Sequence, residues 1–298
     1  MQCVGILQAR HTSNGKDIGE ALFLNQETII NLTDIDKMEE SKMSKYKELE
    51  DLFAEWEEAQ KDQSRKGLSG KEIKACNTIP TDGVNHIKQD SFSKDGLLDK
   101  DAKNIDILFV LKESHVMNSS YRADKNKFWF KEDIVKEAEN SGAKNNKYYQ
   151  RIKTCAEILQ NGKLAWKKIA YININKRGGF AATDHKALSK YMDAYGDLIR
   201  KQIEIIAPKT IVIMGAAYNT YDPFIKAKIL EVDEKSICTE DIQLGGKNKP
   251  FRYAHANGPD KFSAELIYMY HPACRFGNYE RYFEEIWKKA EKCRLERR

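Results

Sequence analysis

The sequence has no closely spaced cysteine pair and no long apolar run. Its six cysteines form no Cys-x-x-Cys motif, which excludes the common zinc and iron–sulfur ligand patterns. No stretch approaches the roughly 20 apolar residues that a membrane-spanning helix needs. The N-terminus has no basic segment leading into a long apolar one, so we expect no secretory signal. We therefore expect a cytoplasmic protein with free thiols, no membrane association and no disulfide framework.

The composition is that of a globular chain with a substantial core. Of its 298 residues, 41% are hydrophobic, and 50 Lys and Arg stand against 45 Asp and Glu, for a net charge of +5. This mild basic excess is compatible with a nucleic-acid partner but does not require one. Composition leaves the oligomeric state open, and a monomer is the simplest expectation.

The first 104 residues differ from the rest of the chain. Residues 36–63 are highly charged, and their apolar positions follow the spacing of one helix face: Tyr46, Leu49, Leu52, Phe53 and Trp56. Residues 64–104 are rich in Lys, Asp, Ser and Gly, which indicates loops and turns. We predict that residues 1–104 are a partly helical N-terminal extension that packs on a core formed by residues 105–298.

Residues 105–298 alternate apolar strands with helices. The predicted strands are 105–111, 171–174, 209–214 and 265–270, and the two clearest helices are 184–207 and 279–296. Pro208 ends the first of these helices. This alternation predicts an α/β fold with three layers, α/β/α, around a central, mostly parallel sheet.

Polar residues or a glycine stand at or just after the carboxyl end of each predicted strand. They are a carboxylate at Glu113, carboxamides at Asn173 and Asn175, a glycine turn at Gly215 and an imidazole at His271. Because ligands bind at the carboxyl ends of parallel strands, we expect these groups to converge on one edge of the sheet.

These three side-chain types suit the removal of a base from its sugar. A carboxamide can read the edge of a pyrimidine with two hydrogen bonds. A carboxylate can stabilise an oxocarbenium-like sugar and orient water. An imidazole can stabilise the negative charge that develops on the departing base.

Four segments resemble the uracil-DNA glycosylase superfamily across roughly residues 105–292: ILFVL with KES, YIN with NK, PKTIVIMG, and YHPA. The resemblance implies an α/β/α domain over residues 105–298 and hydrolysis of an N-glycosidic bond in DNA. It implies that Glu113 orients the attacking water and that His271 is the catalytic histidine. Asn173 matches the residue that reads the base, and Asn175 is the alternative reader.

The first motif departs from the pattern of this superfamily. Leu111 and Ser114 stand where the family has Gly and Pro, and His115 falls at the residue that excludes 5-substituted pyrimidines. His115 is therefore expected either in the wall of the base pocket or in a solvent-facing loop. The altered motif predicts a larger base, such as a 5-modified pyrimidine of the kind that phages install.

Basic residues near these motifs are candidates for contacts with DNA phosphates. The resemblance places Arg275 and Phe276 in the loop that family members insert into the minor groove. The full set of candidate DNA-binding residues is Lys176, Arg177, Arg275, Phe276, Lys167 and Lys168. A run of charged residues is also typical of a face that only contacts solvent, so the alternative is that these residues bind no partner.

The sequence thus predicts a monofunctional DNA glycosylase that acts on an extruded base, in repair or in defence against phages. It implies no catalytic metal and no redox cofactor. One alternative is a non-catalytic protein that binds modified bases or nucleotides, and another is an enzyme that acts on free nucleosides. If the protein is not a glycosylase, Glu113 is expected to form an ion pair and His271 to have a structural role.

Overall fold

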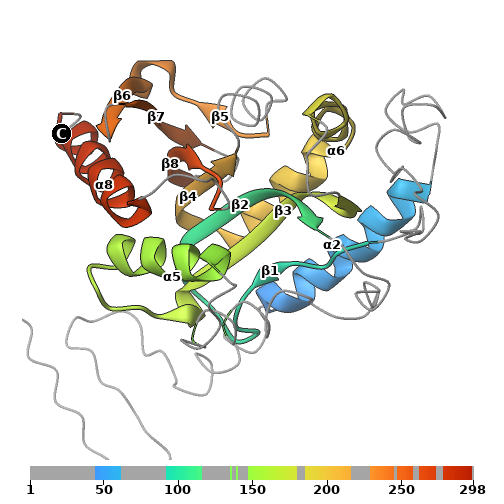
Figure 1. Ribbon diagram of the computed structural model, residues 1–298. Coiled ribbons are helices and arrows are strands. Elements are labelled where there is room, and N and C mark those ends of the chain that lie inside the picture. The colour runs from blue at the N-terminus through green and yellow to red at the C-terminus, as the bar shows by residue number, and fades with distance from the viewer. Residues whose placement is uncertain are drawn as a thin grey trace, which may run out of the picture. The chain divides into compact units, whose positions relative to one another are not determined.

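The structure is a computed structural model of the 298-residue chain. It describes residues 44–61, 92–115, 135, 139, 147–179, 185–215, 229–244, 247–257, 262–272 and 278–296 (Figure 1). The chain divides into two compact units, residues 1–44 and 45–298, and every helix and strand below belongs to the second unit.

One mixed sheet organises this unit. Its strands are β1 (Gly96–Leu97), β2 (Ile105–His115), β3 (Ile169–Gly179), β4 (Pro208–Gly215), β5 (Glu231–Val232), β6 (Cys238–Leu244), β7 (Lys247–Asn257) and β8 (Ser263–Tyr270). They follow the order β1-β3-β2-β4-β8-β7-β5, with β6 paired to β7. The central strands β3, β2, β4 and β8 are parallel, whereas β1, β5, β6 and β7 pair antiparallel with their neighbours. The predicted α/β fold with a mostly parallel centre is confirmed.

The middle residues of the central strands are apolar, as expected where helices cover a sheet. In β4 every residue except Lys209 is buried, the pattern of a strand shielded on both faces. The helices that contribute to the cores are α2 (Lys45–Lys61), α5 (Lys147–Leu159), α6 (His185–Ile206) and α8 (Tyr279–Leu295). Two short 3-10 turns, η2 (Trp166–Lys168) and η3 (Glu234–Ser236), complete the described elements.

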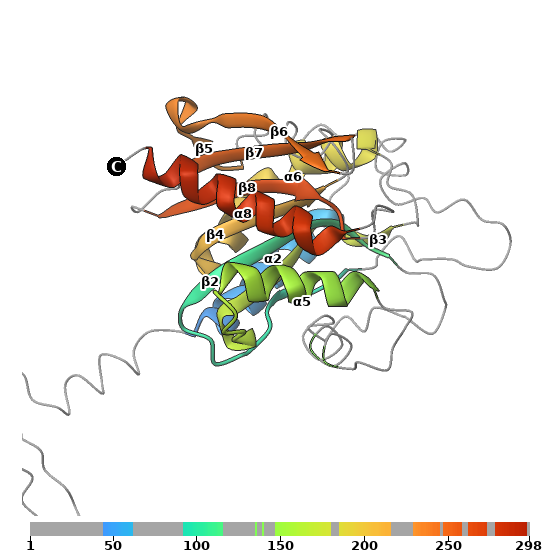
Figure 2. The ribbon, with the colours of Figure 1, turned by 60° about the vertical axis from the view of Figure 1, so that its left-hand side comes forward.

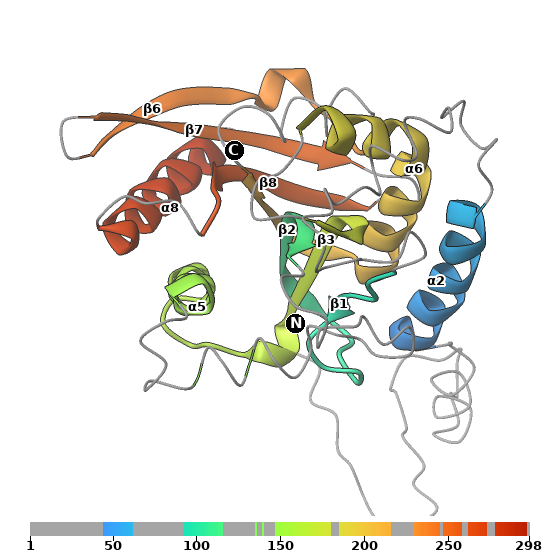
Figure 3. The same cartoon turned by 45° about the vertical axis from the view of Figure 1, so that its right-hand side comes forward.

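Alternate strand residues enter two separate hydrophobic cores. Leu108 and Val110 pack with apolar residues of α2 and α6. Ile107 and Phe109 pack with those of α5 and α8. Figure 2 shows α5 and α8 together in front of the sheet, and Figure 3 shows α2 and α6 beyond its other side.

The helix predicted from spacing within residues 36–63 is present as α2. Leu49, Leu52, Phe53 and Trp56 are all buried in the core that α2 shares with α6. Residues 1–43 lie outside the described residues, so the N-terminal extension and the division at residue 105 stay predictions. None of the described helices combines the length and apolarity that crossing a membrane requires.

The order of the parallel strands defines where a ligand would bind. The four parallel strands lie side by side in the order β3, β2, β4, β8. The chain therefore passes from β2 to β3 on one side and from β4 to β8 on the other side. In open α/β sheets, ligands bind outside the carboxyl ends of strands at such a switch point. The carboxyl ends of β2 and β4 therefore mark the expected binding position.

Candidate functional site

The four strand ends predicted to converge do lie at one edge of the sheet. Leu111 and Glu113 of β2 stand opposite Asn173 and Asn175 of β3. On the other side of β2, Gly215 at the end of β4 stands opposite Tyr270 of β8. The convergence is therefore confirmed for the backbone.

The pairing of β2 with β3 is irregular at this edge. Glu113 is opposite Asn175, but the next residue, Ser114, is opposite Gly178. Two residues of β3, Lys176 and Arg177, therefore have no counterpart on β2. Such a bulge bends a strand and re-aims its side chains, and bulges are common next to active sites.

Several predicted site residues lie outside what the structure describes. The backbones of Glu113, His115 and Arg177 belong to described strands, but the placement of their side chains is not described. Arg275 and Phe276 lie outside the described residues altogether. Their roles stay predictions.

His271 directly follows β8 and is partly buried. Its backbone N–H donates to the carbonyl of Gly215 at 2.8 Å, which holds it against the end of β4. Burial, with a smaller contribution from the positive charge of Lys112, lowers the pKa of His271 to about 4. The imidazole is therefore neutral at pH 7 and can donate one hydrogen bond and accept another.

Helices α5 and α8 hold the turn after His271. Arg151 of α5 donates to the carbonyl of Pro272, and its guanidinium lies 4.5 Å from the ring centre of Tyr279 of α8. The Tyr279 hydroxyl in turn donates to the carbonyl of Tyr270 at 2.9 Å. Arg151 was not among the predicted site residues, and the structure shows it bound to the backbone next to His271.

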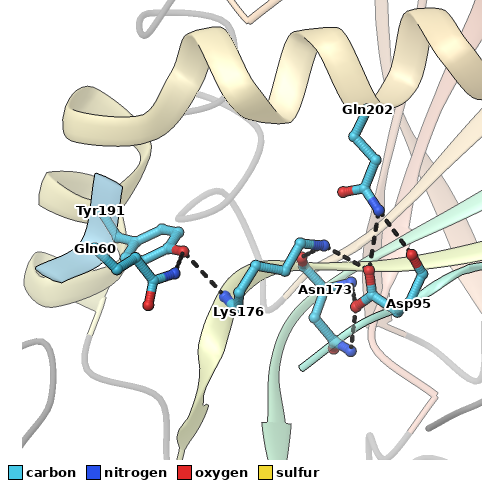
Figure 4. A network of polar contacts seen from close by, with 6 residues as sticks. All are labelled: Gln60, Asp95, Asn173, Lys176, Tyr191 and Gln202. Atoms are coloured by element: carbon cyan, nitrogen blue, oxygen red, sulfur yellow. Dashed lines mark hydrogen bonds and ion pairs between the residues drawn. The ribbon is translucent and has the colours of Figure 1, made fainter. Parts of the chain in front are cut away.

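Asn173 belongs to a buried polar network (Figure 4). Its backbone N–H and its side-chain Nδ2 both donate to Oδ2 of Asp95, at 2.7 and 3.1 Å. Asn173 is 1% exposed and Asn175 is 7% exposed, so the carboxamides are held inside the edge of the sheet. Asp95 was not predicted, because the sequence around it indicated only a turn.

Lys176 is the second charged member of this network. Its side chain is 0% exposed, and its ammonium is paired with Oδ1 of Asp95 and donates to the carbonyl of Asn173 at 2.7 Å. The prediction that Lys176 binds DNA phosphates is therefore wrong, because its charge is neutralised inside the protein. Burial lowers the pKa of Lys176, and the nearby Asp95 carboxylate partly offsets this effect.

Helices α2 and α6 complete the network. Gln202 of α6 donates through Nε2 to the carbonyl and to Oδ1 of Asp95, at 2.8 and 3.1 Å. The hydroxyl of Tyr191 accepts from Gln60 of α2 at 2.6 Å and from the backbone N–H of Lys176 at 3.3 Å (Figure 4). The network therefore connects the carboxyl end of β3 to two helices and to the segment before β1.

Aromatic rings of α2 surround the buried ammonium. The Nζ of Lys176 lies 5.1 Å from the ring centre of Trp56 and 5.9 Å from that of Phe53. At these distances the ring faces attract a cation, and the attraction is larger where water is excluded. The rings therefore add to the stabilisation that Asp95 provides.

Lys167 and Lys168 lie at the opposite edge of the sheet. Both are exposed in η2, immediately before the amino end of β3, and Lys168 pairs with Asp106 near the start of β2 at 3.4 Å. A strand rises roughly 3.3 Å per residue, so Lys168 lies roughly 16 Å along β3 from Asn173 and roughly 23 Å from Asn175. The structure does not bring these two lysines to the candidate site.

The comparisons with known proteins give no family for this chain. No protein-family model matches it, and no curated protein matches it either. Across the parts of the chain that the structure describes, no cluster of three or more His, Cys, Asp or Glu side chains is arranged to hold a metal ion.

Proposed function

We propose that this protein is a DNA glycosylase that hydrolyses the N-glycosidic bond of an extruded pyrimidine, including a 5-modified one. The observation that carries the proposal is the gathering of Glu113, Asn175 and His271 at the switch-point edge by the registers of four parallel strands. We also propose the finer architecture, three α/β/α layers of the uracil-DNA glycosylase type, and duplex or single-stranded DNA as the partner.

His271 would stabilise the departing base. When the bond to the sugar breaks, negative charge develops on the base oxygens, and a donor placed there lowers the barrier. A histidine with a pKa of about 4 is neutral at pH 7, so it acts as a hydrogen-bond donor rather than as a cation. The bond from its N–H to Gly215 and the bond from Arg151 to Pro272 fix the backbone from which the ring projects.

Glu113 would act on the sugar and on water. It lies on β2 next to the switch point and opposite Asn175. An ionised carboxylate there can stabilise the positive charge that develops on the sugar and can orient the attacking water. Hydrolysis then needs only water as co-reactant, and the base leaves with the bonding electrons.

The network around Asp95 favours Asn175 as the residue that reads the base. The Nδ2 group of Asn173 already donates to Asp95, whereas Asn175 lies two residues further along β3, level with Glu113. We therefore assign base reading to Asn175 and a supporting role to Asn173.

The engagement of Asn173 also favours a second candidate function. A protein that binds modified bases or nucleotides without releasing them would use the same edge and would tolerate a carboxamide committed to Asp95. It would bind modified DNA tightly and form no abasic sites. The two functions therefore differ in one measurable product.

Substitution of the two proposed catalytic residues tests the glycosylase directly. We expect Glu113→Gln and His271→Ala each to slow base release at least about tenfold, since removal of one transition-state donor costs roughly 100- to 1000-fold in well-studied sites. The measurement is the appearance of alkali-labile abasic sites in DNA that contains uracil or a 5-modified pyrimidine.

His255→Ala is the matched control. His255 lies on β7 opposite Glu265, near the amino end of β8 and away from the proposed site, so this variant should keep the wild-type rate. Wild-type rates in both Glu113→Gln and His271→Ala would remove these residues from the mechanism.

A further inference from the structure

We propose that Asp95 and Lys176 are a positioning pair for the candidate active site. They hold the carboxyl end of β3 in its irregular path, so that Asn173 and Asn175 keep their places at the sheet edge. The inference rests on the proposed function, because it names residues that act through the base-reading strand.

The first support is the position of Lys176 within the bulge. The pairing with β2 passes from Asn175 directly to Gly178, so Lys176 stands where the regular ladder is interrupted. Its ammonium reaches back to the carbonyl of Asn173, three residues earlier. This hydrogen bond connects the two ends of the segment 173–176, which contains both asparagines.

The second support is the number of donors that Asp95 collects. Its carboxylate accepts from the backbone and side chain of Asn173, from Lys176 and from Gln202. A carboxylate accepts about four hydrogen bonds and donates none. Asp95 therefore dictates that Nδ2, rather than Oδ1, of the Asn173 amide faces it.

Asp95 is itself fixed to the same strand. Gly96 and Leu97 pair antiparallel with Tyr171 and Ala170 of β3, and the N–H of Ser93 donates to the carbonyl of Lys176 at 2.7 Å. The residues on both sides of Asp95 are thus bonded to β3 on both sides of Asn173. The carboxylate has little freedom to move away from the strand end.

Stability alone does not account for these charges. Both side chains are 0% exposed, and removing two charges from water costs several kcal/mol per ion, which their attraction repays only with good geometry. A well-packed apolar pair of similar size often gives equal or greater stability. What the charged pair adds is a defined direction for each hydrogen bond.

Three variants separate positioning from stability: Asp95→Asn, Lys176→Met and the double variant. Each single change leaves one buried charge without its counter-ion, so both single variants should lose stability and activity. In the double variant neither charge remains, so the urea midpoint should return most of the way to that of the wild type. If the pair positions the strand end, the kcat for base release should stay at least about tenfold low, with the KM for DNA within about threefold of the wild type.

Glu265→Gln is the matched control for loss of an ion pair. Glu265 of β8 binds Arg294 of α8 through two hydrogen bonds, and it lies near the amino end of β8. This variant should lose stability without any change in kcat. Hydrogen exchange of residues 169–179, measured by mass spectrometry, should accelerate in the double variant and not in Glu265→Gln.

The outcomes are distinct. If kcat returns together with stability in the double variant, the pair is only structural and the inference is wrong. If the wild-type protein releases no base from any of the tested DNAs, the proposed function is wrong instead. In that case the hydrogen-exchange data still test whether the pair positions the strand end. Unchanged protection of residues 169–179 in the double variant would contradict the positioning role.

Discussion

At the scale of single residues, His271 has the clearest electrostatic signature near the site. Its pKa of about 4 lies well below the ordinary value of 6.5, chiefly because of burial. Between these values the unfolded chain binds a proton that folded His271 does not bind. The contribution of this group to stability is therefore complete above pH 6.5 and is lost as the pH falls towards 4.

We predict that His271→Asn weakens the dependence of stability on acid pH. The wild type should lose up to roughly 3 kcal/mol more free energy of unfolding than the variant between pH 7 and pH 4, since one pKa unit corresponds to about 1.4 kcal/mol. Urea unfolding at several pH values measures the difference. Carboxylates that titrate in the same range contribute equally to both proteins, so their effect cancels in the difference. Parallel plots of unfolding free energy against pH for the two proteins would contradict the prediction.

The cysteines give a second residue-scale prediction. Cys155 and Cys293 are buried, and burial raises the pKa of both thiols, that of Cys293 to about 12. Because the thiolate is the reactive form, both should resist iodoacetamide at pH 8 in the folded protein and react after unfolding in urea. Cys238 is partly exposed and serves as the internal comparison; peptide mass spectrometry that finds all three equally labelled would overturn this account.

Sequence reasoning found His271 and the asparagines because each follows an apolar strand. It missed Asp95 and Arg151 because their partners lie 78 and 121 positions away along the chain. Lys176 was assigned to the DNA-facing surface because it is basic and lies next to a predicted motif. Strand alternation gave no contrary signal, since the residues of β3 are buried at both parities from Ile169 to Lys176.

At the scale of elements, α2 shows that the spacing of apolar residues can predict a helix and its buried face. The spacing of its apolar residues predicted the helix and the face that it buries, and both are confirmed. Helix α5 carries a comparable stripe that includes Ile152, Cys155 and Ala156, all buried. This helix was not among the predicted ones, although the period of its apolar residues indicates a buried face.

The antiparallel strands β5, β6 and β7 were not predicted. Strand β6 alternates exposed polar residues with few apolar ones, and β7 contains Pro250, which weakens a strand assignment. The Gly245-Gly246 pair between the two strands is a turn signal for a hairpin.

For α2 we predict a sharp contrast between two adjacent positions. Trp56 is 0% exposed within the core, so Trp56→Ala should lower the free energy of unfolding by roughly 3–5 kcal/mol. Glu55 forms an exposed ion pair with Lys201, and Glu55→Ala should cost less than about 1 kcal/mol. Urea unfolding of both variants tests the contrast, and similar losses would show that α2 does not form part of the core.

At the scale of the whole molecule, the topology links fold to function. The order of the four parallel strands creates a switch point between β2 and β4, and the registers bring the polar strand ends to that edge. The order of the four parallel strands along the chain could be predicted from sequence. Their order in space could not, because pairing between distant strands is decided by packing of the whole sheet.

The most direct measurement is mass spectrometry of the bases that the full chain liberates from DNA. Normal DNA, uracil-containing DNA and DNA from phages with 5-modified pyrimidines are incubated with the protein, and free bases and abasic sites are counted in parallel. The account predicts a free pyrimidine from at least one of these DNAs, with one abasic site for each base released. Tight binding to DNA with no free base and no abasic site would contradict it.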